Sequence, residues 1–399
     1  MKAGWVTKRL GEVCDFRGGG TPSKAVERYW QGDIPWVSPK DMKFDVVSDS
    51  IDHVSVEAIE GSATSLIPKD SVLIVVRSGI LARIVPIALT GCELTINQDL
   101  KALCPKKGID ARFLYYLLEG KMDVLLASVS RGATVHRLTT DLIRSVDFLL
   151  PPLPEQQRIV AILDEAFDGI ATAKANAEKN LQNAHALFEN HLRSVFIQHG
   201  DGWLEKRLGD VCHKITDGTH ATPTYTKSGV PFLSVKDLTK GFIDFSDTRF
   251  ISVEEHQALT RRCKPVKNDI LYTKVGTTGV AQVVDVDEEF SIFVSVALLK
   301  INHEIIYNSY LEHFLNAPYA REQAQQRTRG MANKNLVITD IKEIVVDFPR
   351  SLEQQRSLVT EIDTLRAETQ RLESIYRQKL AALVALKKSL LDQAFTGLL

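Results

Sequence analysis

The chain has 399 residues, of which 44% are apolar and 25% are charged, and its formal net charge is −1 at pH 7. The length predicts two or three domains, and the composition is typical of an ordinary soluble globular protein. No apolar stretch approaches the roughly 18–20 residues of a membrane span and no signal peptide opens the sequence, so we expect a cytoplasmic protein. The near-zero charge gives no nucleic-acid-binding footprint, so such a surface would need local clustering or a basic partner.

The sequence is a duplication that runs its full length. The opening phrase GWVTKRLGEVC, from Gly4, returns as GWLEKRLGDVC, from Gly202. Much later in each copy, LTTDLIRSVDFLLPPLPEQQRIV from Leu138 returns as LVITDIKEIVVDFPRSLEQQRSLV from Leu336. A period this long is not a solenoid repeat, whose units span about 20–50 residues. The pattern predicts two pseudo-twofold-related copies of one domain pair, with the chain termini close together.

The longer part of each copy, residues 1–153 and 200–350, has the pattern of a mixed α/β globule. Short β-rich runs such as 71–76 and 292–296 are separated by turn residues. The glycine-rich stretch 17–21 lacks the strand-to-helix GxGxxG pattern, so a turn is the better interpretation.

The remaining part of each copy, residues 154–199 and 351–399, predicts one long helix. Apolar residues recur in steps of three or four from Ile159 to Val195, and a second stripe runs from Leu358 to Leu390. A helix of about 45 residues is about 68 Å long and must bury its stripe. We expect the two helices to pair as an antiparallel coiled coil. The alternative is that each helix packs only onto its own globule.

Catalytic motifs are missing from the sequence. There is no GxxxxGK[ST] phosphate loop, no HExxH and no GxSxG. The amino-methyltransferase pattern of an acidic or asparagine residue, two prolines and an aromatic is also missing. Five cysteines without a CxxC pair indicate neither a disulfide framework nor a zinc site: Cys14, Cys92, Cys104, Cys212 and Cys263. We therefore expect no active site and no metal site in this chain.

Several short segments, in order, resemble the specificity (S) subunit of type I restriction–modification enzymes. They include Gly-Gly-Gly-Thr-Pro-Ser at 18–23, Trp-Val-Ser-Pro-Lys-Asp-Met at 36–42 and Asn-Gln-Asp-Leu at 97–100. The most specific is Pro-Leu-Pro-Glu-Gln-Gln-Arg-Ile-Val at 152–160. The resemblance covers the whole chain, and the duplication is part of it.

This resemblance implies an α+β fold with two pseudo-twofold-related target recognition domains, 1–153 and 200–350, separated by two long antiparallel spacer helices, 154–199 and 351–399. It implies a non-catalytic subunit that reads a bipartite double-stranded DNA site, one half-site per domain. Two methyltransferase subunits that modify adenine would be partners, and restriction subunits can join them. The chain itself would carry no cofactor, whereas S-adenosylmethionine, ATP and Mg belong to the partners.

The second copy departs from the family pattern in places. Thr-Asp-Gly-Thr-His at 216–220 replaces the triple glycine, and Val-Ser-Val-Ala at 294–297 stands where Asn-Gln-Asp-Leu would be. Such differences fit two domains that read different sequences, and they weaken residue-by-residue transfer from the family to the second copy.

Polar and basic residues in turn-like segments are the candidate DNA contacts, because base edges and phosphates are bound by such side chains. In the first domain we expect Thr21, Ser23, Lys24, Ser38, Lys40, Arg77, Arg131, Thr134, His136 and Arg137. In the second we expect Thr219, His220, Thr222, Lys236, Lys274, Thr277, Arg327, Arg329, Asn333 and Lys334. A solvated loop without DNA contact is the alternative for each residue.

Two other functions compete with this interpretation. One is a coiled-coil adaptor with two protein-binding heads that does not read DNA. The other is a DNA-processing enzyme with an unusual active site, which would transfer methyl groups or cleave DNA by itself.

Overall fold

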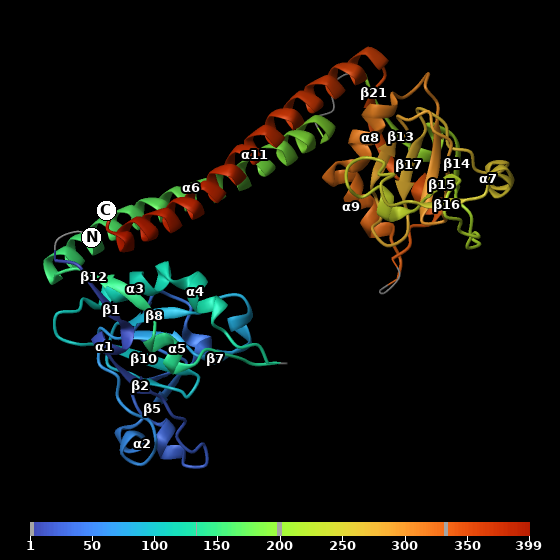
Figure 1. Cartoon of the computed structure of the whole chain (residues 1–399). Coiled ribbons are helices and arrows are strands. Elements are labelled where there is room, and N and C mark those ends of the chain that lie inside the picture. Colours follow the sequence, from blue (N-terminus) through green and yellow to red (C-terminus); the bar gives the residue numbers. More distant parts are fainter. Residues whose placement is uncertain (1–3, 133, 198–201, 331–333) are drawn as a thin grey trace. The chain divides into compact units, whose positions relative to one another are not determined.

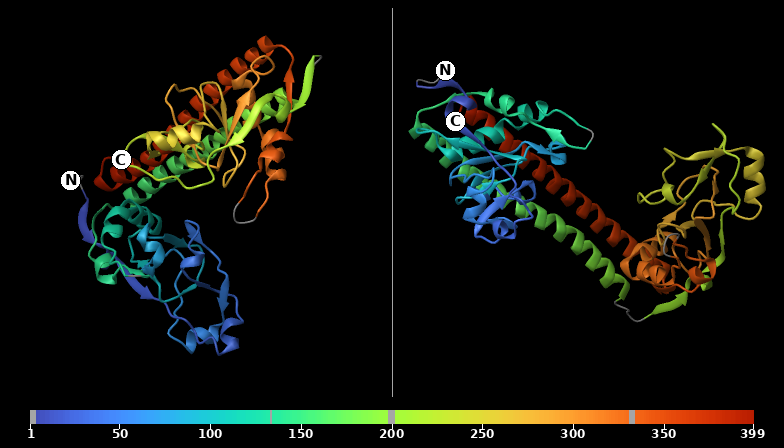
Figure 2. Two further views of the ribbon diagram at one scale, coloured as in Figure 1. Left: turned by 90° about the vertical axis from the view of Figure 1, so that its right-hand side faces the viewer. Right: turned by 90° about the horizontal axis from the view of Figure 1, so that it is seen from below.

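The computed structural model describes residues 4–132, 134–197, 202–330 and 334–399. The chain divides into two compact units, of which unit 1 comprises Met1–Ala177 with Gln378–Leu399 and unit 2 comprises Glu178–Arg377. Each unit holds one mixed α/β head and a portion of each of two long helices (Figures 1 and 2). We call residues 4–152 head 1 and residues 202–351 head 2. Within the described ranges, no helix has the length and apolarity needed to span a bilayer.

Head 1 is built on a five-stranded main sheet with the strand order β2-β10-β6-β8-β4. In that order the strands are Cys14–Gly18, Leu100–Pro105, Val72–Val75, Ile87–Thr90 and Val46–Val47. All four residues of the central strand β6 are buried, as expected for a strand with both faces covered. Helix α3 (Ala111–Gly120) packs against β8, β10 and β6 (Figure 1).

Smaller elements surround the main sheet of head 1. A three-stranded sheet has the order β5-β3-β9, and two ribbons pair β1 with β12 and β7 with β11. These strands are Asp52–Val54 (β5), Ile34–Val37 (β3), Thr95–Ile96 (β9), Val6–Arg9 (β1), Asp147–Leu150 (β12), Arg77–Ser78 (β7) and His136–Arg137 (β11). The other helices are Leu10–Val13 (α1), Val56–Glu60 (α2), Met122–Ala127 (α4) and Thr140–Arg144 (α5), with 3₁₀ turns at 27–30, 39–41 and 79–82.

Head 2 repeats this plan. Its main sheet has the order β14-β20-β17-β18, with strands Cys212–Asp217, Val296–Ile301, Ile270–Thr273 and Ala281–Val283. The smaller elements are the sheet β16-β15-β19 (Arg249–Ile251, Val230–Leu233, Ser291–Ile292) and the ribbon β13-β21 (Trp203–Arg207, Val345–Pro349). The helices are Val253–Thr260 (α7), Asn308–Asn316 (α8), Pro318–Arg327 (α9) and Ile338–Lys342 (α10), with 3₁₀ turns at 208–210 and 235–237.

The two long helices, α6 (Leu153–Ile197) and α11 (Leu352–Thr396), run antiparallel in each unit. In unit 1, Nη2 of Arg158 near the start of α6 donates a hydrogen bond to the backbone oxygen of Leu399, 2.8 Å away. In unit 2, His191 near the end of α6 lies 3.4 Å from Glu361 near the start of α11. The predicted antiparallel helix pair is confirmed within each unit.

Both long helices contribute to the core of each head. Ile159 and Leu163 of α6 and Leu391 and Ala394 of α11 belong to the core of unit 1. The core of unit 2 likewise includes residues of both helices: Leu192, Phe196, Val359 and Ile362. The alternative that each helix packs only onto its own head is therefore wrong.

A buried glutamine fixes the start of each long helix. The Gln156 side chain accepts a hydrogen bond from the backbone N–H of Asp110 at 2.9 Å, and it donates to the carbonyls of Gly108 and Pro151 at 3.1 and 2.9 Å. In unit 2, Gln355 makes the same three bonds, to the backbone of Tyr307, Ile305 and Pro349. Gln156 is the first glutamine of its EQQR phrase and Gln355 is the second of its own, so the phrase joins helix to head in both copies with a shift of one residue between them.

Candidate nucleic-acid interface

The loop that follows the first strand of each main sheet takes the same path in both heads. A Cβ atom at Gly19 would lie 2.0 Å from the carbonyl oxygen of Ile96, and one at Gly218 would lie 2.0 Å from that of Ile292. In each head the N–H of the next residue donates a hydrogen bond to this carbonyl, at 3.0 Å in head 1 and 3.2 Å in head 2. The close approach requires glycine, which explains why one glycine remains where the triple glycine is replaced.

The candidates in this loop are mostly exposed. Thr21, Ser23 and Lys24 in head 1 and His220 and Thr222 in head 2 are exposed, while Thr219 is half-buried. The Thr21 hydroxyl donates a hydrogen bond to Oε1 of Gln98 at 2.6 Å, and Nε2 of His220 lies 3.3 Å from Oδ2 of Asp217. The loops can therefore present hydroxyl, amine and imidazole groups to a ligand.

A second pair of matching segments carries Lys40 and Lys236. Nζ of Lys40 contacts Oδ2 of Asp52 at 2.9 Å, and Nζ of Lys236 contacts Oδ2 of Asp247 at 3.1 Å. The hydrogen bond with Asp52 raises the pKa of Lys40, so this lysine stays charged. Each remains exposed.

Ser38 is a candidate that the structure places inside the head. Its side chain is only 6% exposed, and its hydroxyl donates to Oδ2 of Asp41 at 2.8 Å. Its backbone N–H donates to the same oxygen at 2.9 Å. This capping arrangement holds the 3₁₀ turn at 39–41, so Ser38 positions Lys40.

In head 1, Arg77 and Arg137 lie opposite each other in the ribbon β7–β11. Nε of Arg77 donates a hydrogen bond to Oδ1 of Asp99 at 2.5 Å. These three side chains line one pocket. Sequence reasoning selected both arginines and missed Asp99, because the hydrogen bond joins residues from separate strand ends.

The loop between α4 and β11 in head 1 is closed by backbone hydrogen bonds between Ser130 and Arg137, at 2.8 and 3.0 Å. Arg131 and Thr134 are exposed at its tip, and His136 is half-buried. The corresponding loop of head 2 is closed in the same way by Arg329 and Asn335, at 2.9 and 2.8 Å.

The head 2 candidates around this loop differ in their surroundings. Nη1 of Arg327 donates to the Gln323 carbonyl within α9 at 3.1 Å, which leaves Arg327 half-buried at the helix end. Nη2 of Arg329 pairs with Oδ2 of Asp340 at 3.1 Å. Lys334 and Thr277 are exposed. Asn333 lies outside the described residues.

Lys274 is the candidate least accessible to a ligand. It is 5% exposed, and its Nζ lies 3.1 Å from Oδ2 of Asp217, which is 7% exposed. The same carboxylate accepts a hydrogen bond from Nη1 of Arg262 at 3.3 Å. Charges in such a buried network are paired because unpaired ones are costly, so Lys274 holds the loop around Gly218 in place.

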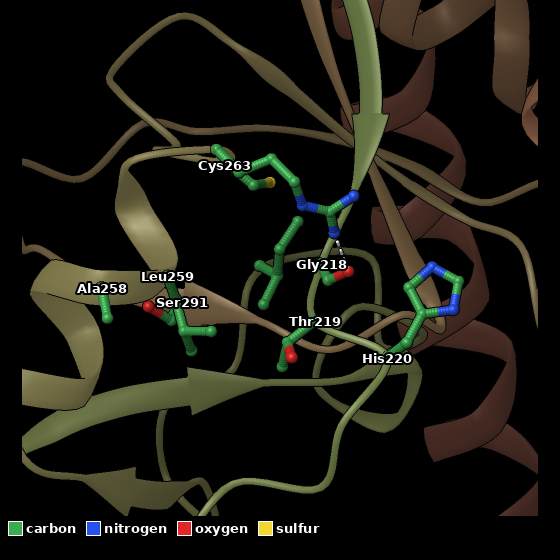
Figure 3. A pocket seen from close by; sticks show the side chains of 9 residues that line it. Gly218, Thr219, His220, Ala258, Leu259, Cys263 and Ser291 are labelled. Carbon is green, nitrogen blue, oxygen red and sulfur yellow. Dashed lines mark hydrogen bonds between the residues drawn. The ribbon is translucent and has the colours of Figure 1, made fainter.

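A pocket of head 2 lies beside this network (Figure 3). Gly218, Thr219 and His220 form one wall, and Cys263 projects from the segment after α7. Burial raises the pKa of the Cys263 thiol to about 11, which keeps it protonated and a poor nucleophile. The described parts of the chain hold no group of three or more His, Cys, Asp or Glu side chains placed to bind a metal ion.

The backbone pairing corrects one alignment between the copies. Leu100 pairs with Val75 and Val296 with Thr273, in strands that match between the heads. Ser295, rather than Val296, therefore stands at the position of Asp99. The segment matching Asn-Gln-Asp-Leu is 293–296, one residue earlier than the sequence comparison placed it.

Comparison with known proteins finds the same domain twice along the chain. The family model for the type I restriction modification DNA specificity domain matches residues 2–182 and again residues 200–380. The specificity subunit of the type I restriction enzyme EcoR124I/EcoR124II of Escherichia coli is 41% identical over 168 residues, which cover 42% of this chain and 41% of that protein. The MjaIX specificity subunit of Methanocaldococcus jannaschii is 30% identical over 265 residues, 61% of this chain and 60% of that protein. Both matches thus span less than two thirds of the relative.

Solved structures share the fold over the whole chain. A structure from work on the complex assembly and conformational transition of a type I restriction–modification system superposes with a TM-score of 0.79 at 20% identity, covering 100% of this chain and 99% of that one. The HsdS subunit from Thermoanaerobacter tengcongensis superposes with a TM-score of 0.64 at 19% identity, covering 100% and 98%.

Proposed function

Because the chain belongs to the family of type I restriction modification DNA specificity domains and carries that domain twice, we propose that it is the DNA-sequence-specificity subunit of a type I restriction–modification complex. Each head reads one half of a bipartite double-stranded DNA site. The observation that carries this proposal is the double match of the family model. The repeated loop geometry around Gly19 and Gly218 supports it.

The polar loops of each head form the DNA-reading surface in this proposal. Exposed residues such as Arg137 and Lys24 in head 1 and Arg329 and Lys334 in head 2 have the chemistry of base and phosphate contacts. Ser38 and Lys274 are buried, so we assign them the positioning of neighbouring loops rather than direct contact.

The partners follow from the same proposal. Two methyltransferase subunits bind the complex and methylate adenine, and restriction subunits join it for cleavage. The boundaries 1–153, 154–199, 200–350 and 351–399 delimit the two recognition domains and the two spacer helices. The chain works in the cytoplasm without a catalytic centre or cofactor of its own. S-adenosylmethionine, ATP and Mg serve the partner subunits.

A selection from random-sequence duplexes tests this function. The chain, assembled with its methyltransferase subunits, is expected to enrich a two-part motif with a fixed gap. A protein-binding adaptor would enrich no motif. Methyl transfer or DNA cleavage by the chain alone would instead support an enzyme. If Arg137→Ala and Arg329→Ala leave both the enriched motif and the affinity unchanged, these two residues are not DNA contacts.

A further inference from the structure

The pocket lined by β7, β11 and Asp99, the residue before β10, carries an excess of positive charge. Arg77 and Arg137 are direct cross-strand partners, so their side chains leave the ribbon on the same face. Like charges placed directly opposite each other destabilise a strand pair. Asp99 is the single carboxylate in the lining and offsets only one of the two charges.

Asp99 is itself held in position by Asn97. Nδ2 of Asn97 donates to Oδ2 of Asp99 at 3.3 Å, and Oδ1 of Asn97 accepts from the Asp99 backbone N–H at 3.0 Å. Asn97 is 6% exposed, so this end of the hydrogen-bonded series is buried in the head. At the other end, Nε of Arg77 donates to Oδ1 of Asp99; we call the series the Asn97–Asp99–Arg77 relay.

These hydrogen bonds leave the two terminal amino groups of Arg77 available to a ligand. Only Nε is bonded to Asp99, and neither terminal amino group has a partner among the residues that the structure describes. The Arg137 guanidinium has no partner within the same ranges either. The Arg77 side chain is 41% exposed and lines the pocket together with Arg137, so its terminal amino groups are available to a ligand in this pocket.

Such a fork matches the edge of a guanine. Guanine presents O6 and N7 as neighbouring acceptors in the major groove, and arginine donates to both at once. A phosphate can also accept from both amino groups of an arginine, but the Asp99 carboxylate beside the guanidinium repels a phosphate and does not repel the neutral edge of a base. The Asn97–Asp99–Arg77 relay therefore has the geometry of base reading rather than of backbone attraction.

We propose that Arg77, held by Asp99 and Asn97, reads a guanine in the half-site bound by head 1, and that Arg137 donates to an acceptor beside it. Asp99 and Asn97 are positioning residues. This inference rests on the proposed function and adds to it the base and the residues that select it.

Head 2 has the same backbone here without the charges. Val275 stands at the position of Arg77, since its N–H bonds the carbonyl of Ser295 at 3.4 Å as that of Arg77 bonds Asp99 at 3.2 Å. Val275 bridges to Asn335 as Arg77 pairs with Arg137. The guanine selected by this relay thus belongs to one half-site only, and the other half-site is a control within the same complex.

The test uses the full chain assembled with its methyltransferase subunits and duplexes carrying its recognised site with each base pair replaced in turn. Arg77→Lys keeps the charge but loses the planar fork. We expect discrimination at one G·C pair of one half-site to fall by about 5- to 150-fold, with the other half-site unchanged. Asp99→Asn is expected to reduce the same discrimination without weakening non-specific affinity, because it removes a negative charge that repels phosphate.

The charge-matched control is Arg83→Lys, at an exposed arginine outside the pocket, which is expected to change nothing. Unchanged discrimination in Arg137→Lys would remove Arg137 from the proposal, and unchanged discrimination in Arg77→Lys would overturn it. So would equal weakening on all duplexes with a shallower salt dependence, since that identifies phosphate contacts. A wild-type complex without any sequence preference would overturn the proposed function itself, which is a separate and recognisable result.

Discussion

Gln156 and Gln355 show how much a single buried side chain contributes to the helix–head junction. They are 1% and 0% exposed, and each satisfies three backbone groups that a smaller side chain would leave without partners. A buried polar group left unsatisfied costs about 1–3 kcal/mol. The EQQR phrase shared by the two copies points to this segment, but it aligns Gln156 with the exposed Gln354, and only the hydrogen bonds identify Gln355 as the equivalent residue.

We predict that Gln156→Ala and Gln355→Ala each lower the free energy of unfolding by about 1–3 kcal/mol or more. Urea denaturation of the free chain measures the effect. The matched controls are Gln157→Ala and Gln354→Ala, which alter exposed neighbours and are expected to change stability by less than about 0.5 kcal/mol. Equal effects at the buried and exposed positions would contradict the assigned role.

The ion pair of Lys274 and Asp217 gives a second test at this scale. Lys274→Met removes one partner of a buried pair, and we expect a loss of about 3 kcal/mol, the lower end of the usual range, because Arg262 still contacts Asp217. Lys236→Met removes an exposed ion pair and should cost at most about 1 kcal/mol. Thermal unfolding compares the two variants. A cost at Lys274 no larger than at Lys236 would refute the positioning role.

The contact between α8 and α11 in unit 2 contains a titratable group. His313 is 3% exposed, its Nε2 lies 2.9 Å from Oδ1 of Asp363, and its Nδ1 lies 2.9 Å from Nη2 of Arg366. The matching contact of unit 1 has a tyrosine instead, because there the Tyr116 hydroxyl of α3 donates to Asp164 of α6. Burial, and then the nearby charge of Arg366, lower the pKa of His313.

This shift predicts a pH dependence of stability. Because the folded-state pKa lies below the ordinary value near 6.5, the unfolded chain binds more protons in the interval between the two values. The stability that neutral His313 contributes to the folded state is fully present above about pH 6.5, and it is lost as the pH falls through the folded-state pKa. Between pH 7.5 and 5, the free energy of unfolding measured in urea should therefore fall less for His313→Gln than for wild type. Identical losses would rule out His313 as the source.

Elements were easier to predict than their contacts. The three-and-four spacing of apolar residues predicted both long helices, because this spacing matches the period of a helix and not that of a strand. The loop after β14 was harder, because its backbone path depends on the carbonyl of Ile292, far away in sequence. The one-residue alignment error at Ser295 arose because Val294 and Val296 flank it on both sides, and only strand pairing fixes their register.

The candidate interface was predictable as a set of loops and not as a set of contacts. Exposure separates Arg137 from Lys274, and no local pattern shows that Lys274 turns inward to meet Asp217. The orienting role of Asp99 also depends on tertiary structure. Long-range pairing decides which polar residues are presented to a ligand and which hold the loops that present them.

At the scale of the whole molecule, the duplication links the fold to the proposed function. Each unit contains a head together with portions of both long helices, so each is built from segments far apart in the sequence. The heads share a backbone plan while their presented side chains differ, as at Arg77 and Val275. Two heads of one design with different surfaces suit a DNA site with two different halves.

The most direct test of the central claim is a methylome of cells that express this chain with its methyltransferase. The proposed function predicts adenine methylation at a two-part motif with a fixed gap, and the loss of that methylation when the gene for this chain is deleted. Methylation of a short continuous motif, or a methylome unchanged by the deletion, would contradict it.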